Sequence, residues 1–121
     1  MKVKTSTLTY AALNWAVSVA NKNEDYFDLS KTYCDPDGRL YLCTKGGFSV
    51  EYTDWDQGGP IIDRERIATQ FWVSEGEWEA LIKGGFFASR GPTPLIAAMR
   101  CYVASKLGDE VEIPDELLKT P

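Results

Sequence analysis

The sequence predicts a single α+β domain in which an antiparallel β-meander of three to five strands packs with an N-terminal and a C-terminal helix. Three observations support this class. Apolar residues repeat at helical spacing near each end of the chain, alternating apolar and polar segments lie between, and glycine-containing turns separate those segments. A length of 121 residues suits one domain, and 44% hydrophobic residues suffice for a core. The order fits a two-layer or an α/β/α sandwich.

The first helix is expected over residues 10–22. Leu8, Thr9 and Leu13 occupy the N′, N-cap and N4 positions of a hydrophobic staple. The polar residues of this segment recur at helical spacing and form one narrow stripe, and most of its other residues are apolar. We therefore expect this helix to pack on the core.

An irregular loop and a hairpin are expected next. Residues 21–34 have no sustained period and indicate a loop. Residues 35–38 (Asp-Pro-Asp-Gly) form a type I turn with glycine at the left-handed position, which starts the hairpin. Residues 39–44 have apolar side chains on both faces, as an interior strand does, and residues 48–52 alternate, as a half-exposed strand does. Residues 45–47 (Lys-Gly-Gly) turn the chain between them.

The centre of the chain is expected to hold a long connection followed by two strands. Residues 53–66 are rich in turn formers, and residues 67–73 alternate again. Residues 77–82 allow two interpretations. The capping box at residues 74–77 (Ser-x-x-Glu) permits a short helix, whereas the alternation and the preceding Gly76 favour a strand. We take the strand.

The last helix is expected over residues 94–107. Thr93 is its N-cap, Pro94 occupies the first helical position, and Gly108 follows the last turn. Only three residues inside it are polar, and they do not share a face: Arg100, Ser105 and Lys106. Such a helix must be covered on most sides, by the sheet and by either the first helix or a second subunit. A homodimer is therefore one alternative.

The negative charge is concentrated at the C-terminus. The whole chain has 13 basic and 18 acidic residues, a net charge of −5. Residues 1–107 have 12 bases and 13 acids, a net of −1, and residues 108–121 have Lys119 against five acids, a net of −4. We therefore divide the chain into a domain over residues 1–107 and an acidic tail. The tail also contains four apolar residues, Val111, Ile113, Leu117 and Leu118, and these predict that it docks on the domain as a strand-like segment. The alternative is a free peptide offered to a partner.

Composition excludes several classes of function. An acidic surplus argues against direct nucleic-acid binding. The absence of histidine excludes Ser-His-Asp and Cys-His catalysis and histidine-bound metals. The three cysteines include no Cys-x-x-Cys pair, which argues against a disulfide framework or a thiolate zinc site. The apolar stretch at residues 8–20 is too short and too polar for a membrane span, and we expect a cytoplasmic protein. From the histidine and cysteine content we expect no metal or cofactor.

Two features are candidates for binding, and no residue is a catalytic candidate. Residues 54–60 combine carboxylates, an aromatic ring and an amide with two glycines, as functional loops often do, and the candidates there are Asp54, Trp55, Gln57, Gly58 and Gly59. Arg100 is the other candidate, because its guanidinium lies on an otherwise apolar helix. It either forms a structural ion pair, with Asp54, Asp56 or Asp63, or anchors an anionic ligand near the helix start.

Three parts of the sequence are distinctive. They are residues 1–6 (Met-Lys-Val-Lys-Thr-Ser) with residues 12–17 (Ala-Leu-Asn-Trp-Ala-Val), the motif of residues 53–62 (Thr-Asp-Trp-x-Gln-Gly-Gly-Pro-Ile-Ile) and the long run of residues 91–112 that begins Gly-Pro-Thr-Pro-Leu-Ile. Together they resemble the NinX-like family of small tailed-phage and prophage proteins. The resemblance implies a phage gene expressed in the bacterial host cytoplasm and a compact helix–sheet–helix domain. It implies no activity and transfers no catalytic residue.

These observations favour a non-enzymatic phage accessory protein that binds a host or phage protein. The alternative is a small-ligand-binding protein or minor enzyme that uses the 54–60 loop and Arg100. A third interpretation is a DNA-mimic inhibitor, but a domain with a net charge near −1 lacks the rows of carboxylates that such a mimic needs.

Overall fold

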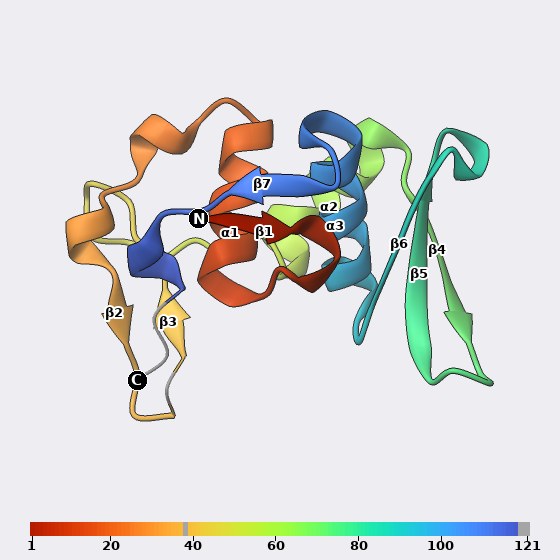
Figure 1. Ribbon diagram of the computed structural model, residues 1–121, viewed down its shortest axis with the longest axis horizontal. Coiled ribbons are helices and arrows are strands. Elements are labelled where there is room, and N and C mark those ends of the chain that lie inside the picture. Colours follow the sequence, from red (N-terminus) through yellow and green to blue (C-terminus); the bar gives the residue numbers. More distant parts are fainter. Residues whose placement is uncertain (38, 119–121) are drawn as a thin grey trace.

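The computed structural model describes residues 1–37 and 39–118 and confirms the α+β class (Figure 1). Its α-helices are α1 (Tyr10–Ala20), α2 (Trp55–Glu65) and α3 (Pro94–Leu107). Within the described ranges the strands form three small antiparallel sheets rather than one. Short 3-10 turns connect the elements, at Thr5–Thr7, Glu24–Tyr26, Leu29–Lys31, Lys83–Gly85 and Asp115–Leu117.

The largest sheet is the three-stranded meander β4–β5–β6. Its strands are β4 (Ala68–Trp72), β5 (Glu77–Ile82) and β6 (Phe87–Gly91). The segment at residues 77–82 is therefore a strand, as predicted. Gly76 has a φ of +66°, a value that suits a glycine in the tight turn before β5 better than the first turn of a helix.

The two smaller sheets are pairs of short strands. The hairpin joins β2 (Tyr33–Cys34) and β3 (Leu40–Tyr41), and Gly38 of its turn lies outside the described residues. The other pair brings the two ends of the chain together, because β1 (Lys2–Lys4) is antiparallel to β7 (Glu110–Glu112). Figure 1 shows these two strands side by side in front of α1 and α3.

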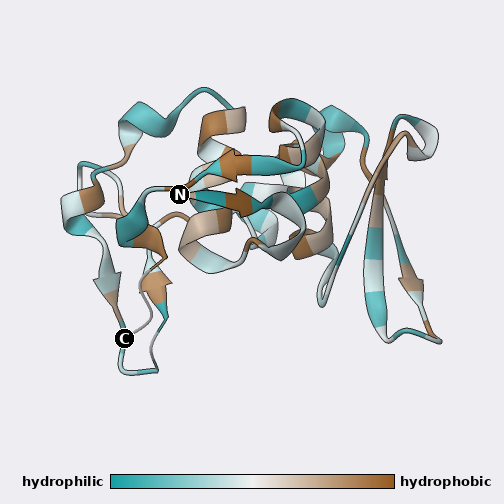
Figure 2. Ribbon diagram, in the orientation of Figure 1, coloured by the Kyte–Doolittle hydropathy of each residue, from teal (hydrophilic) through white to brown (hydrophobic). Residues whose placement is uncertain are grey.

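Helix α3 lies at the centre of the core, with the meander on one side and α1 on the other (Figure 1). Most of its residues are buried, and Thr93 caps it as predicted, because the Thr93 hydroxyl accepts a hydrogen bond from the Ile96 N–H at 3.1 Å. Helices α1 and α3 lie on the same side of the meander (Figure 1), so the α/β/α arrangement is not adopted. Figure 2 shows hydrophobic segments in α1, α3 and β7 and hydrophilic positions that interrupt β5.

Helix α1 forms where the staple predicts it, but its polar stripe is largely inside the protein. Leu8 and Leu13 are both buried, whereas the Thr9 side chain makes no capping bond. Asn14 is 1% exposed, and its side-chain oxygen accepts a hydrogen bond from the Tyr52 N–H at 2.8 Å. A residue of the predicted polar stripe, Asn14, is therefore buried, and it binds the segment that leads into α2.

The strands predicted at residues 39–44 and 48–52 were too long. Only Leu40–Tyr41 is a strand, and the second segment contributes one isolated bridge, between Cys43 and Ser49. The turn at residues 45–47 does form, since the Gly47 N–H donates to the Thr44 carbonyl at 2.9 Å. The Tyr52 N–H donates to the Asn14 side chain and is therefore not available to a neighbouring strand. This bond directs the segment toward α1 instead of into a sheet.

The prediction of a loop over residues 53–66 was wrong, because most of the segment is α2. The helix contains Pro60 and two glycines, which have the lowest helix propensities. Packing overrides those propensities. Ile61 is buried in the core, and Arg66 ends the helix in the left-handed conformation with a φ of 54°.

Candidate functional site

The candidate residues at 54–59 form the first turn of α2, where they do not converge on a ligand. The Asp54 carbonyl accepts hydrogen bonds from the N–H groups of Gln57 at 3.1 Å and Gly58 at 2.7 Å. The side chains of Asp54, Trp55 and Gln57 are exposed, and Trp55 is 61% exposed. Gly58 is buried and Gly59 is partly buried, so neither glycine opens a cradle for a ligand.

Arg100 is buried and bonds to main-chain carbonyls rather than to the predicted aspartates. Its Nε donates to the Leu8 carbonyl at 2.9 Å, and its terminal nitrogen donates to the Arg90 carbonyl at 2.8 Å. Burial lowers the pKa of Arg100, and the negative charge of Glu77 opposes this shift. The guanidinium thereby ties α3 to the segment before α1 and to the free edge of β6.

In the described part of the chain, neither Arg100 nor the start of α2 lines any of three surface pockets. These pockets are lined by other residues, between α1, α3 and β7, around Met1 and Trp15, and around Arg39 in the hairpin. Among residues 1–37 and 39–118, no three His, Cys, Asp or Glu side chains gather at a metal site. Over the same ranges, no helix has the length and apolar composition needed to cross a membrane.

The surface that sequence reasoning missed is the uncovered face of the meander. Ala80 and Ile82 are buried on the face that packs against α3. The other alternate positions of β5, and the residues of β4 and β6 paired with them, point the other way. We call the surface that they form the outer face: Ala68, Gln70, Trp72, Glu77, Glu79, Leu81, Ala88 and Arg90. No other element covers this face in Figure 1.

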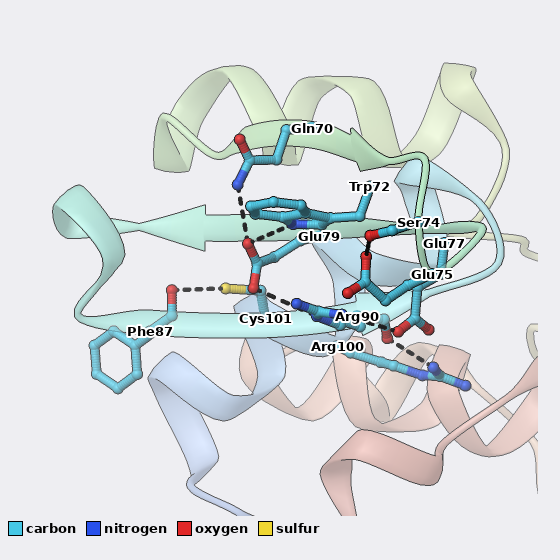
Figure 3. A network of polar contacts seen from close by, with 10 residues as sticks. All are labelled: Gln70, Trp72, Ser74, Glu75, Glu77, Glu79, Phe87, Arg90, Arg100 and Cys101. Carbon is cyan, nitrogen blue, oxygen red and sulfur yellow. Dashed lines mark hydrogen bonds and ion pairs between the residues drawn. The ribbon is translucent and has the colours of Figure 1, made fainter.

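Hydrogen bonds and ion pairs connect the centre of the outer face (Figure 3). One oxygen of Glu79 accepts from the Gln70 amide at 2.9 Å and from the Trp72 indole at 3.0 Å. The Arg90 guanidinium lies 3.6 Å from the other oxygen of Glu79 and donates to Glu77 at 3.2 Å. It also lies 5.7 Å from the centre of the Trp72 ring, within range of a cation–π contact.

This network also holds its charges in place. The bonds from Trp72 and Gln70 lower the pKa of Glu79, with a further contribution from Arg90, against partial desolvation that raises it. The bond to Glu77 raises the pKa of Arg90. The outer face therefore presents an indole and a guanidinium beside the carboxylates of Glu77 and Glu79, and its contacts favour the charged forms of Glu79 and Arg90.

The alternation of β4 and β5 contained a signal for this face, because it separates Gln70 and Trp72 from Thr69 and Phe71. The alternation alone did not predict the register in which the three strands pair. Gln70 lies opposite Glu79, and Glu79 lies opposite Arg90, so three charged or polar residues from three strands meet in one row. That row exists only once the strands are paired.

Two comparisons with known proteins bear on identity. No curated protein sequence matches the chain. The family model described as "Bacteriophage P22, NinX" matches residues 4–106, from β1 through nearly all of α3. The match spans most of the chain, including α1, α2, the meander and nearly all of α3, and this chain belongs to the NinX family of bacteriophage proteins.

Proposed function

We propose that this phage protein is a non-catalytic interaction module, which binds a host or phage protein through the outer face of its meander. The observation that carries the proposal is the preorganised group formed by Trp72, Glu79 and Arg90 on a sheet face that no other element of the described chain covers (Figure 1). Tryptophan and arginine are the residue types that contribute most to binding energy in protein interfaces. Here both are already held by neighbours, so binding costs little additional side-chain entropy.

The charge of the surface indicates the kind of partner. Glu77 and Glu79 outnumber Arg90 on the outer face, and the exposed Glu75 lies in the adjoining turn. A partner surface with a basic patch around an apolar centre complements this arrangement.

Capture from a bacterial host lysate tests the proposal with two matched tryptophan variants. Trp72→Ser removes the indole of the outer face, and Trp55→Ser removes an exposed indole on α2. We expect wild type and Trp55→Ser to retain the same specific partner and Trp72→Ser to lose it, with circular dichroism spectra unchanged in all three.

Arg90→Ala should weaken capture as well, because it removes the guanidinium beside the Trp72 ring. Loss of the partner by Trp55→Ser alone would indicate that the partner binds at α2, and this result would contradict the proposal. Failure of the wild-type protein to capture any specific partner would contradict it too.

A further inference from the structure

The free edge of β4 lacks three features by which proteins commonly protect an exposed strand. Natural edges are often blunted by charged residues, proline or bulges. The five residues of β4 (Ala-Thr-Gln-Phe-Trp) contain no charge and no proline, and the strand pairs with β5 in an unbroken register.

The other sheet edges differ from β4. Strands β2 and β3 are uncharged but only two residues long, and a very short strand is itself a protected edge. Strand β1 has Lys2 and Lys4, and β7 has Glu110 and Glu112. On the free side of β6, the Arg90 carbonyl is already bonded to the Arg100 guanidinium. Among the described residues, β4 is therefore the least protected edge.

The direction of that bond to Arg90 fixes which groups of β4 point outward. Because the Arg90 carbonyl faces away from β5, Glu79 opposite it directs its own main chain toward Gln70 on β4. Hydrogen-bonding direction alternates along a strand, so the N–H and C=O groups of Thr69 and Phe71 point to the free edge. In the described chain, neither residue has a main-chain hydrogen bond beyond those of the β4–β5 ladder.

The sequence of β4 is complementary to itself around Gln70. In an antiparallel pair with Gln70 opposite Gln70 of a second copy, the small Ala68 lies opposite the large Trp72 on the outer face. On the inner face Thr69 lies opposite Phe71. Phe71 is 48% exposed although it belongs to the inner face, so a second copy would cover apolar surface there. No like charges meet in this register.

We propose that the protein forms a two-fold symmetric homodimer in which the β4 strands of two copies pair antiparallel about Gln70. Thr69 and Phe71 of each copy exchange hydrogen bonds with Phe71 and Thr69 of the other, which gives four main-chain bonds across the axis. The two meanders become one six-stranded sheet whose outer face is continuous. The dimer concerns the strand edge, and it stands or falls independently of the partner proposed for the outer face.

The test is the oligomeric state of the full chain by sedimentation equilibrium. Gln70→Lys places two ammonium groups opposite each other at the axis, while the lysine keeps an acceptor in Glu79 of its own copy. Like charges at that spacing should raise the dimer dissociation constant by at least about tenfold. Ala88→Lys is the matched control, because it adds the same charge to the same face at the opposite edge, and it should leave the dimer intact. A wild-type protein that stays monomeric at roughly 200 μM, far above the micromolar constants of ordinary association, overturns the proposal, as does equal dissociation of both variants.

A cross-link tests the register even if Gln70→Lys fails to fold. In a background where the exposed Cys34 is replaced (Cys34→Ser), Gln70→Cys puts two thiols opposite each other at a separation that a disulfide can span. Mild oxidation should give a covalent dimer from Gln70→Cys and none from Ala88→Cys. A dimer from Ala88→Cys alone, or from neither variant, overturns the proposed interface.

Discussion

At the scale of single residues, burial separates the three cysteines into one accessible thiol and two protected ones. Cys34 is exposed, whereas Cys43 and Cys101 are buried. Burial raises the pKa of Cys101 to about 11, because a low-dielectric surrounding disfavours the thiolate, and it raises the pKa of Cys43 as well. The thiolate is the nucleophile in alkylation. At pH 8 both buried cysteines are therefore neutral thiols.

We predict that iodoacetamide at pH 8 modifies one cysteine per folded chain, and that peptide mapping places it at Cys34. In denaturant all three should react, because unfolding returns the pKa values of the buried thiols to their ordinary range. Cys34→Ser should abolish labelling of the folded protein. Rapid labelling of Cys101 without denaturant would mean that α3 opens readily, in conflict with its burial.

Arg100 illustrates what residue types alone leave open. The sequence placed a guanidinium on an apolar helix, and this correctly indicated that it needs acceptors. The acceptors are the carbonyls of Leu8, in the segment before α1, and of Arg90 in β6, which precede Arg100 by 92 and 10 residues. Every residue has a main-chain carbonyl, so residue types do not show which carbonyl will accept a hydrogen bond. Aspartates can be identified in the sequence, and the prediction therefore named aspartates as the partners of Arg100.

At the scale of elements, the two adjacent glycines of α2 have different roles. A Cβ at Gly58 would lie 2.2 Å from the Tyr52 carbonyl oxygen and 2.6 Å from a methyl group of Leu95. A Cβ at Gly59 would meet no atom within 4 Å. Gly58 therefore permits the close approach of α2 to the chain before it, and Gly59 contributes only flexibility.

We predict opposite effects for alanine at these positions. Gly59→Ala should stabilise the protein by about 0.5–1 kcal/mol, because alanine loses less entropy in a helix. Gly58→Ala gains the same propensity but clashes with main chain, so a net destabilisation of about 1–3 kcal/mol is expected. Urea unfolding of the two variants measures both. Equal effects would show that α2 does not pack against residue 52 as described.

The elements that the sequence predicted well are those whose signals are local. The cap, proline and terminal glycine of α3 lie within one segment, and they located the helix at residues 94–107. The alternation of β5 likewise decided between strand and helix. By contrast, α2 forms in spite of Pro60 and two glycines, because it packs closely against Tyr52 and Leu95. Long-range packing of that kind has no local signal.

At the scale of the whole molecule, the acidic C-terminal segment lies against the domain from which the charge count separated it. Val111, Ile113 and Leu117 are buried, and the Ile113 N–H donates to the Met1 carbonyl at 3.0 Å. Strand β7 also gives β1 its partner. The negative charges of the segment are on exposed residues, so the apolar side chains carry the contact with the body.

The contribution of this segment to stability distinguishes a docked tail from a free one. Ile113 is 1% exposed, and Ile113→Ala should lower the free energy of unfolding by about 2–4 kcal/mol, as truncation of a buried isoleucine does. Leu118 is only partly buried at the end of the described chain, and Leu118→Ala should cost less than about 1 kcal/mol, in proportion to the smaller area it removes from contact. Urea denaturation followed by circular dichroism measures both. If the tail were a free peptide in solution, both variants would unfold with the wild-type midpoint; a large loss for Ile113→Ala alone is the result that the buried contact requires.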